Sequence, residues 1–444
     1  MGTSFHTVPG AIVAPRGFLA AGVTCGIQRL GTGKGSLKGR KPDLALIVSE
    51  VPATVAGLFT TNQVCAAPVK ICLERVRRGV AQAIVANSGN ANACTGARGL
   101  RDAHAMTAQV ARALHMPAEH VLVASTGRIG VPLPMPAVRA GIRAALDALD
   151  NSPEAAAAAA HAIMTSDTRP KHLAIEFRLG PRTVRLGGIA KGAGMIHPGL
   201  SLNGRRPAAQ PPTAPHATML CFLTSDAAVA PAALRRALRD AVARSFNRIT
   251  VDGDMSTNDT VLLLANGLAE NTPLTGSEPA FGVFQAALDH VCLELAKMIV
   301  RDGEGVHRVV TVRVSGARTA READAAARAV ANSALVKTSW HGGDPNWGRV
   351  MDALGYSVAR IVEERVDIGY SAPGSRQILW SVRGGQPTRV PFARLCAAVA
   401  PKEFDLHIRL NQGRAGAVIY AADLTEAYVD FNKGDVTNPA ALGG

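Results

Sequence analysis

Short apolar runs alternate with longer amphipathic stretches along this chain. The apolar runs are rich in β-branched residues, which is typical of buried strands. They cover residues 44–50, 81–90, 120–126, 173–179, 217–225, 260–267 and 308–316. The amphipathic stretches are rich in alanine and arginine, and most begin with a residue suited to the first turn of a helix. They cover residues 101–115, 153–164, 231–244, 281–300 and 319–333.

This alternation predicts a mixed α/β or α+β protein in which sheets and helices pack in layers. The chain has 444 residues, of which 47% are hydrophobic, so it can bury a sizeable core. One stretch breaks the alternation: residues 198–215 contain five prolines, two glycines and almost no apolar periodicity. That composition predicts an exposed, flexible loop.

The net charge of +14 raises the question of a nucleic-acid partner. The arginines are spread along the whole chain, and only residues 34–41 form a dense basic run. That run lacks the interleaved aromatic residues that single-strand binding uses, and only 4% of the chain is aromatic. A solvated basic loop is therefore favoured over a nucleic-acid interface, and the positive field suits anionic substrates.

Several other classes are not favoured by the sequence. No apolar run is long enough to span a membrane, and the N-terminal segment lacks a signal-peptide pattern, so a cytoplasmic protein is expected. The seven cysteines form no C-x-x-C pair and are expected to be buried thiols in a reducing compartment. The twelve histidines show no H-E-x-x-H or similar ligand pair, so no metal is expected. The GTGKGS run at 31–36 lacks Walker A spacing.

Three glycine- and asparagine-rich loops are candidates for chemistry: NSGNANACTG (87–96), STGRIG (125–130) and IAKGAGMIHPG (189–199). Loops that follow strands in this way can expose backbone N–H groups to an anion or oxyanion. Plain tight turns are an equally good interpretation of each loop on its own. The acidic turns at 251–260 and 300–307 lack EF-hand spacing and are interpreted as structural turns.

A set of motifs in a fixed order resembles a known family. The set comprises VAPRGFLAAGVTCGIQ (13–28), DLALIVSEVPATVAGLFTTNQVCAAPV (43–69), ANSGNANACTG (86–96), STGRIG (125–130), MTSDTRPK (164–171), KGAGMI (191–196), ATML (217–220), SFNRITVDGDMSTNDT (245–260), DGEG (302–305), VKTSWHGGDPNWGRV (336–350) and DLTEAYVDFN (423–432). The chain resembles, over about 9–437, the arginine biosynthesis bifunctional protein family of self-processing glutamate/ornithine N-acetyltransferases. The resemblance implies their fold, which is related to that of self-processing aminopeptidases.

The resemblance also implies a reaction. The precursor would be cleaved between Ala217 and Thr218 into an α chain of residues 1–217 and a β chain of residues 218–444. Thr218 would then accept acetyl from N2-acetylornithine and pass it to glutamate in a ping-pong reaction. Cleavage frees the α-amine of the nucleophile, and this amine, with an ordinary pKa of about 7.7 to 8.0, can act as the base.

By the same resemblance, the Thr126 hydroxyl and the Gly127 N–H form the oxyanion hole. The substrate-binding positions are Thr168, Lys191, Thr218, Glu304, Asn432 and Thr437. A lysine and hydroxyl groups suit the α-carboxylate that both substrates share, and Glu304 suits the amine of ornithine. No cofactor or metal is implied, and acetyl-CoA is a possible second acetyl donor.

The implied assembly is a heterotetramer of two α and two β chains acting on small molecules, without nucleic acid or membrane. In this sequence the stretch between Lys191 and Thr218 is longer than is usual in the family, and the surplus falls in the proline-rich segment 198–215. Three alternatives remain open. They are a self-processing aminopeptidase or amidase that uses the same threonine, a processing-defective relative with a binding or structural role, and a basic nucleic-acid-binding protein.

Overall fold

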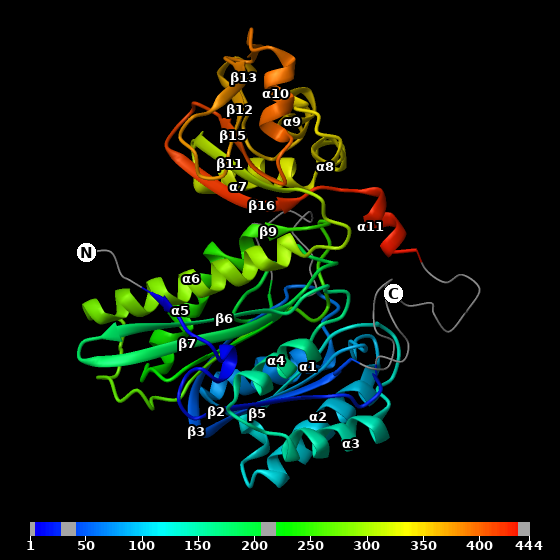
Figure 1. Ribbon diagram of the computed structural model, residues 1–444, viewed down its shortest axis with the longest axis vertical. Helices are drawn as coiled ribbons and strands as arrows, with labels where there is room; N and C mark the ends of the chain where they lie inside the picture. Colours follow the sequence, from blue (N-terminus) through cyan, green and yellow to red (C-terminus); the bar gives the residue numbers. More distant parts are fainter. Residues whose placement is uncertain (1–4, 28–40, 206–218, 434–444) are drawn as a thin grey trace. The chain divides into compact units, whose positions relative to one another are not determined.

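The computed structural model describes residues 5–27, 41–205 and 219–433 (Figure 1). The chain forms two compact units. The first contains the residues up to Asn247 and the segment Asp254–Asp302, and the second contains Arg248–Gly253 and Gly303–Lys433. Each unit has its own sheet and its own helices, so each is described separately.

The first unit is built on a nine-stranded mixed sheet in the order β1-β6-β7-β8-β10-β3-β4-β5, with β2 paired to β3. The strands are β1 (His6–Thr7), β2 (Phe18–Val23), β3 (Leu44–Phe59), β4 (Val80–Asn87), β5 (Val121–Ser125), β6 (Lys171–Leu179), β7 (Arg182–Lys191), β8 (Leu220–Ser225) and β10 (Thr260–Ala265). β8 and β10 run parallel at the centre, and every one of their residues is buried. Such continuous apolar runs are expected where both faces of a sheet are covered.

Strand β3 connects two parts of this sheet. Its first part pairs with β2 and β4 and its last part pairs with β10. The register of the β3–β4 ladder shifts between Val48 and Ala53, and Pro52 lies in this interval, where a missing N–H is tolerated. The irregularity lets one long strand serve both parts.

Helices cover the sheet of the first unit. The helices are α1 (Ala67–Arg75), α2 (Gly96–Ala113), α3 (Met135–Asp147), α4 (Pro153–Ala162), α5 (Pro231–Arg244) and α6 (Pro279–Arg301). α5 and α6 pack against each other, and α6 also packs on β6 and β7 (Figure 1). α1 and α2 pack on β5, whereas α4 packs on β2 and β3.

The second unit has a seven-stranded sheet in the order β14-β13-β12-β15-β11-β16-β9. Its strands are β9 (Ile249–Thr250), β11 (Val309–Ala317), β12 (Asp367–Ser371), β13 (Leu379–Arg383), β14 (Gln386–Pro387), β15 (Glu403–Arg409) and β16 (Ala415–Ala422). Its helices are α7 (Ala320–Asn332), α8 (Ala334–His341), α9 (Trp347–Gly355), α10 (Phe392–Val399) and α11 (Glu426–Phe431). α7 packs on β11 and β16 through a stripe of small residues, Ala323, Ala326, Ala327, Val330 and Ala331, at helical spacing.

The predicted α/β fold class is confirmed, and each predicted strand and helix contains or overlaps an observed one. The strand β7 was missed because two glycines interrupt its apolar pattern. A Cβ at Gly187 would lie 1.8 Å from the carbonyl oxygen of Ala11, so this position requires a close backbone approach that only glycine allows. None of the helices in the described ranges is both long and apolar enough to cross a membrane.

Two expectations from the sequence were wrong in part. Of the segment 198–215, residues 206–215 lie outside the described residues, and residues 198–205 are not exposed throughout, because Pro198 and Leu200 are buried. The Leu200 backbone is held by the Asn247 side chain, which accepts from its N–H at 2.9 Å and donates to its carbonyl at 3.1 Å. The cysteines are not all buried, because Cys94 is exposed and Cys25, Cys65 and Cys396 are half-buried.

Candidate active site

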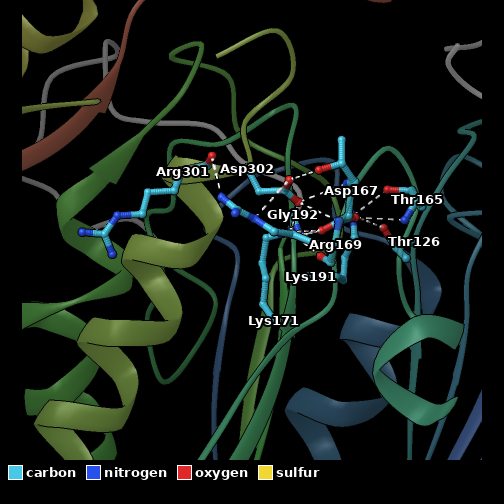
Figure 2. A network of polar contacts seen from close by, with 10 residues as sticks. Thr126, Thr165, Asp167, Arg169, Lys171, Lys191, Gly192, Arg301 and Asp302 are labelled. Atoms are coloured by element: carbon cyan, nitrogen blue, oxygen red, sulfur yellow. Dashed lines mark hydrogen bonds and ion pairs between the residues drawn. The ribbon is translucent and has the colours of Figure 1, made fainter. Parts of the chain in front are cut away.

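A cluster of buried charged and hydroxyl side chains lies at the ends of strands β6 and β7 (Figure 2). Lys171 is the first residue of β6, and Lys191 is the last residue of β7. The two strands form an antiparallel hairpin in which Lys171 pairs with Ala190, so both lysines lie at the same end. Asp167 precedes β6, and Asp302 directly follows helix α6.

Lys171 is held by two carboxylates. Its Nζ lies 2.6 Å from Asp167 Oδ1 and 2.6 Å from Asp302 Oδ2. All three side chains are at most 3% exposed. Burial of an ammonium group is costly unless it is paired and hydrogen-bonded, and this arrangement supplies both. Lys171 therefore ties the end of α6 to the loop before β6.

Lys191 points toward hydroxyl groups rather than toward a close carboxylate (Figure 2). Its Nζ donates to Thr165 Oγ1 at 2.7 Å and to Thr126 Oγ1 at 3.3 Å, and it lies 3.9 Å from Asp167 Oδ2. Gly192 N–H also donates to Asp167 Oδ1, at 2.7 Å. Asp167 thus links the two lysines and holds the turn that follows β7.

Asp167 remains ionised in this environment. Burial by itself would raise the pKa of its carboxyl group, but the ammonium groups of Lys171 and Lys191 and the N–H of Gly192 hold that pKa well below its usual value. The cluster also affects Lys41, which the sequence had placed in a solvated basic loop. Lys41 is half-buried, and its pKa is lowered to about 8 by burial and by the two lysines, although Asp167 and Asp302 oppose this shift.

We expect Asp167→Asn to lower the free energy of unfolding by about 3 to 5 kcal/mol, because it removes one of the two carboxylates that hold buried Lys171 and the carboxylate that lies 3.9 Å from buried Lys191. Glu176→Gln is the matched control: it breaks the half-exposed ion pair between Glu176 on β6 and Arg185 on β7, and it should cost less than about 1 kcal/mol. Chemical denaturation of both variants measures the difference.

The pH dependence follows from the depressed pKa of Asp167. The stabilisation should be fully present above the ordinary Asp pKa of 3.8 and should decline as the pH falls below that value. The difference between Asp167→Asn and the unsubstituted protein should therefore narrow in acid. Equal stability of the two proteins at neutral pH would contradict this account of the cluster.

The predicted oxyanion residues follow strand β5. Thr126 is fully buried, and its N–H donates to the Asn87 carbonyl at 3.0 Å. Gly127 has a φ of +129°, and a Cβ there would lie 2.3 Å from the carbonyl carbon of Gly89. Within the described part of the chain, Gly127 N–H donates to no acceptor. A backbone donor that the fold leaves unused is what an oxyanion hole requires.

The asparagines of the 87–96 loop shape this region rather than presenting their side chains to a ligand. Asn87 Nδ2 donates to the Asn90 carbonyl at 2.9 Å, and Asn87 Oδ1 accepts from Ser125 Oγ at 2.6 Å. Asn90 Oδ1 accepts from Asn92 N–H, and Asn92 Nδ2 donates to the Gly99 carbonyl. The interpretation as tight turns is therefore confirmed for this loop, and the oxyanion interpretation stays a prediction.

The predicted substrate-binding residues fall into two groups. In the first unit, Thr168 is bound to Asp302 through its N–H at 3.1 Å and through its hydroxyl, so it borders the same cluster as Lys191. In the second unit, Asn432 Nδ2 donates to Glu304 Oε2 at 2.9 Å. The structure therefore brings Thr126, Lys191 and Thr168 together around Asp167 and Asp302, and it pairs Glu304 with Asn432.

Three of the predicted residues, Ala217, Thr218 and Thr437, lie outside the described residues. Met219 follows Thr218 in the chain; its N–H donates to Asp259 Oδ1 at 2.7 Å, and its carbonyl accepts from Thr260 N–H at 3.1 Å. The backbone directly after the predicted nucleophile is therefore anchored to the start of β10.

Sequence reasoning did not single out Thr165, Asp167, Lys171 or Asp302 as site residues. Each lies inside a motif that carries the resemblance, MTSDTRPK or DGEG. The available signal was the co-occurrence of acidic and basic residues in short motifs at the predicted strand and helix ends. The burial of these four residues and the contacts between them depend on the fold, so they could not be predicted from the local sequence.

Comparison with known proteins decides the family. The model of the ArgJ family matches residues 24–435. The Arginine biosynthesis bifunctional protein ArgJ of Symbiobacterium thermophilum is 48% identical over 423 residues, which is 95% of this chain and 98% of that protein. The chain belongs to the ArgJ family. The ArgJ protein of Caldanaerobacter subterraneus subsp. tengcongensis is 42% identical over 95% of this chain and 98% of its own length.

Among solved structures, a chain of ornithine acetyltransferase from Mycobacterium tuberculosis, in complex with ornithine, is 40% identical and has a TM-score of 0.40. The match covers 45% of this chain and all of that chain. Membership of the ArgJ family rests on the whole-length sequence matches. It confirms the predicted acyltransferase class and the predicted place in arginine biosynthesis.

Proposed function

We propose that this ArgJ-family protein transfers acetyl from N2-acetylornithine to glutamate through an acetyl-enzyme on Thr218, after cleaving itself between Ala217 and Thr218. Family membership over residues 24–435 supports the reaction. The structural observation that best supports the chemistry is the pair formed by the Thr126 hydroxyl and the unused Gly127 N–H, next to Lys191.

A threonine hydroxyl is a weak nucleophile until a base removes its proton. Cleavage before Thr218 would place the new α-amine on the same residue as the hydroxyl. With an ordinary pKa of about 7.7 to 8.0, part of this amine is neutral at physiological pH and can accept that proton. The cleavage reaction and the transfer reaction then use the same hydroxyl.

Attack on the amide carbonyl of acetylornithine places negative charge on its oxygen. The Thr126 hydroxyl and the Gly127 N–H are donors of the kind that stabilise such an oxyanion. Lys191 Nζ donates to Thr126 Oγ1, and a donor on the oxygen polarises the hydroxyl and makes it a better donor in turn. In this proposal Lys191 strengthens the oxyanion hole as well as contributing positive charge for a substrate carboxylate.

Strand pairing supports a processed form in which the α chain, 1–217, and the β chain, 218–444, stay together. β7, from the α chain, pairs along its last six residues with β8, the first strand of the β chain. β10, also from the β chain, pairs with β3 of the α chain over six residues. These ladders lie in the buried centre of one sheet, so cutting the connection would not separate the two pieces. A heterotetramer of two such pairs is the proposed assembly.

The proposed substrates are small molecules that share an α-carboxylate, and ornithine and its acetyl derivative also carry a positive side-chain amine. Lys191 and Thr168 would bind the α-carboxylate that acetylornithine and glutamate share, and the Glu304 carboxylate, held by Asn432, would bind the amine of ornithine. Thr437 completes the proposed substrate contacts. The reaction is proposed to occur in the cytoplasm and to need no cofactor. The word bifunctional in the names of the relatives supports acetyl-CoA as a second donor.

The test is a steady-state kinetic analysis with N-acetylornithine and glutamate. If acetyl rests on the enzyme between the two substrates, double-reciprocal plots at several glutamate concentrations should be parallel. Donor alone should add the mass of one acetyl group to the chain that begins at Thr218. Acetyl-CoA is compared with N-acetylornithine in the same assay.

Other results would contradict the proposal. Intersecting lines together with an unmodified second chain would indicate direct transfer without an acetyl-enzyme. Release of free acetate with no acetylglutamate would indicate an amidase that uses the same nucleophile. An uncut chain in fully active material would rule out the self-processing step.

A further inference from the structure

Three side chains of metal-binding type converge in the second unit. They are His307, His341 and Asp423, and one ligand atom of each lies within 4.8 Å of the others. Strand pairing explains the convergence of two of them. Val309 at the start of β11 pairs with Ala422 at the end of β16, which brings His307 and Asp423 together. His341 is the last residue of helix α8.

Asp423 is a buried carboxylate with one oxygen unsatisfied. The residue is 4% exposed, and its Oδ1 accepts from His307 N–H at 3.0 Å. Among the described residues, no donor is hydrogen-bonded to its Oδ2. The ammonium group of Lys337 is nearby, but it donates to the Ala422 carbonyl. A buried carboxylate oxygen without a partner is costly unless a cation binds it.

His341 directs a ring nitrogen at this oxygen. Its Nε2 lies 2.8 Å from Glu426 Oε2, and its Nδ1 lies 3.5 Å from Asp423 Oδ2 without a hydrogen-bond partner in the described residues. The Glu426 carboxylate can only accept from Nε2, so in the neutral form of the ring the hydrogen lies on Nε2. In that form the lone pair of Nδ1 faces the Asp423 carboxylate oxygen, and both atoms are available as ligands for a cation.

This arrangement matches the surroundings of metal-bound histidines. Such histidines usually bind the metal with one nitrogen and donate from the other to a carboxylate, which fixes the ring and strengthens it as a ligand. Glu426 occupies the position of that outer carboxylate. The ring of His307 lies 5.7 Å from that of His341, centroid to centroid, and completes the set from an exposed position.

We propose that His307, His341 and Asp423 form a binding site for a divalent transition-metal ion of the zinc type. Two imidazoles and one carboxylate suit such an ion, whereas Ca²⁺ and Mg²⁺ prefer oxygen ligands alone. Bound to Zn²⁺, which has metal–ligand distances of about 2.0 to 2.2 Å, the ligand atoms would sit closer together than they do here. The exposed His307 side chain can move to close this gap.

Binding has a cost at His307. Its Nδ1 accepts from Arg308 Nη1 at 3.2 Å, and this contact would be given up or rearranged. Arg308 also donates to the Trp340 carbonyl at 3.0 Å, so its guanidinium has another partner to hold it. The ion would connect α8 to the ends of β11 and β16, and thereby stabilise the second unit.

The proposal departs from the absence of a metal site expected from the sequence. That expectation came from short-range ligand spacing. His307, His341 and Asp423 come from three separate segments, and no short motif contains two of them.

The test uses the full-length protein after treatment with a chelator. Calorimetric titration with ZnCl₂ should show one ion bound per chain, and Co²⁺ should give the visible absorption of a nitrogen- and oxygen-coordinated site. His341→Ala and Asp423→Asn should each weaken binding at least about tenfold, since each removes a ligand. His104→Ala, at an exposed histidine on α2, is the matched control and should bind as the unsubstituted protein does.

His341→Ala and Asp423→Asn change partly or fully buried residues and could lose binding by misfolding. Glu426→Gln is a second test without this problem, because the Glu426 side chain is 86% exposed. It should weaken Zn²⁺ binding by about 10- to 100-fold as an outer carboxylate does, while the far-UV circular dichroism stays unchanged. Added Zn²⁺ should also raise the melting temperature of the unsubstituted protein and not that of His341→Ala. Absence of stoichiometric binding, or equal binding by His341→Ala and the unsubstituted protein, overturns the proposal.

Discussion

Thr218→Ala is expected to leave one uncut chain and to reduce acetyl transfer by at least about a thousandfold. On the proposed mechanism the Thr218 hydroxyl attacks twice, first on its own preceding carbonyl and later on the acetyl donor. Alanine removes that hydroxyl from both reactions. Intact mass spectrometry of the purified protein and an acetylglutamate assay measure the two losses on the same sample.

Thr218→Ser is the matched control, because it keeps the hydroxyl and, after cleavage, the α-amine. It should retain part of both reactions. The β7–β8 ladder and the Met219–Asp259 hydrogen bond belong to neighbouring residues, so both variants should fold alike. Full activity in Thr218→Ala would show that the acetyl group never rests on this residue, even though the chain belongs to the ArgJ family.

The second large effect is expected at the oxyanion hole. Thr126→Val removes the hydroxyl but keeps the shape of a fully buried side chain, and it should lower turnover by about 100- to 1000-fold. The loss should appear in kcat as well as in kcat/KM, because the hydroxyl is used chiefly when charge develops on the oxygen. Steady-state kinetics with N-acetylornithine measure both constants.

Thr165→Val distinguishes the proposed role of the Thr126 hydroxyl in the oxyanion hole from an indirect effect on the position of Lys191. Lys191 donates to Thr165 Oγ1 and to Thr126 Oγ1, so either valine removes one of its acceptors, but only Thr126 is proposed to touch the oxyanion. Thr165→Val should therefore retain most of its turnover. Equal losses in the two variants would assign the effect to the position of Lys191. Gly127 is a poorer test, because any side chain there meets the backbone at 2.3 Å.

The periodicity of apolar residues was enough to predict the layered α/β class and most of the strands around the site. Runs such as those of β8 and β10 consist almost wholly of residues that must be buried, and this property is visible locally. The family could also be recognised from the sequence, because the order of its motifs along the chain can be compared without knowing the fold. Strand β7 was not predicted, because its glycines interrupt the apolar pattern. Gly187 is required by its close approach to Ala11, which lies far away in the sequence.

Tertiary structure alone decided which charged residues matter to one another. Asp167, Lys171 and Asp302 look like ordinary surface residues in their motifs, yet they are buried because the ends of β6 and α6 meet. The same holds for His341 and Asp423, whose ring nitrogen and carboxylate oxygen face each other because the ends of α8 and β16 meet. The sequence by itself thus determined most helices and strands around the site, because these depend on residues that are neighbours along the chain. The fold determined the polar clusters, because burial and pairing of charges arise only between segments that are distant in the sequence.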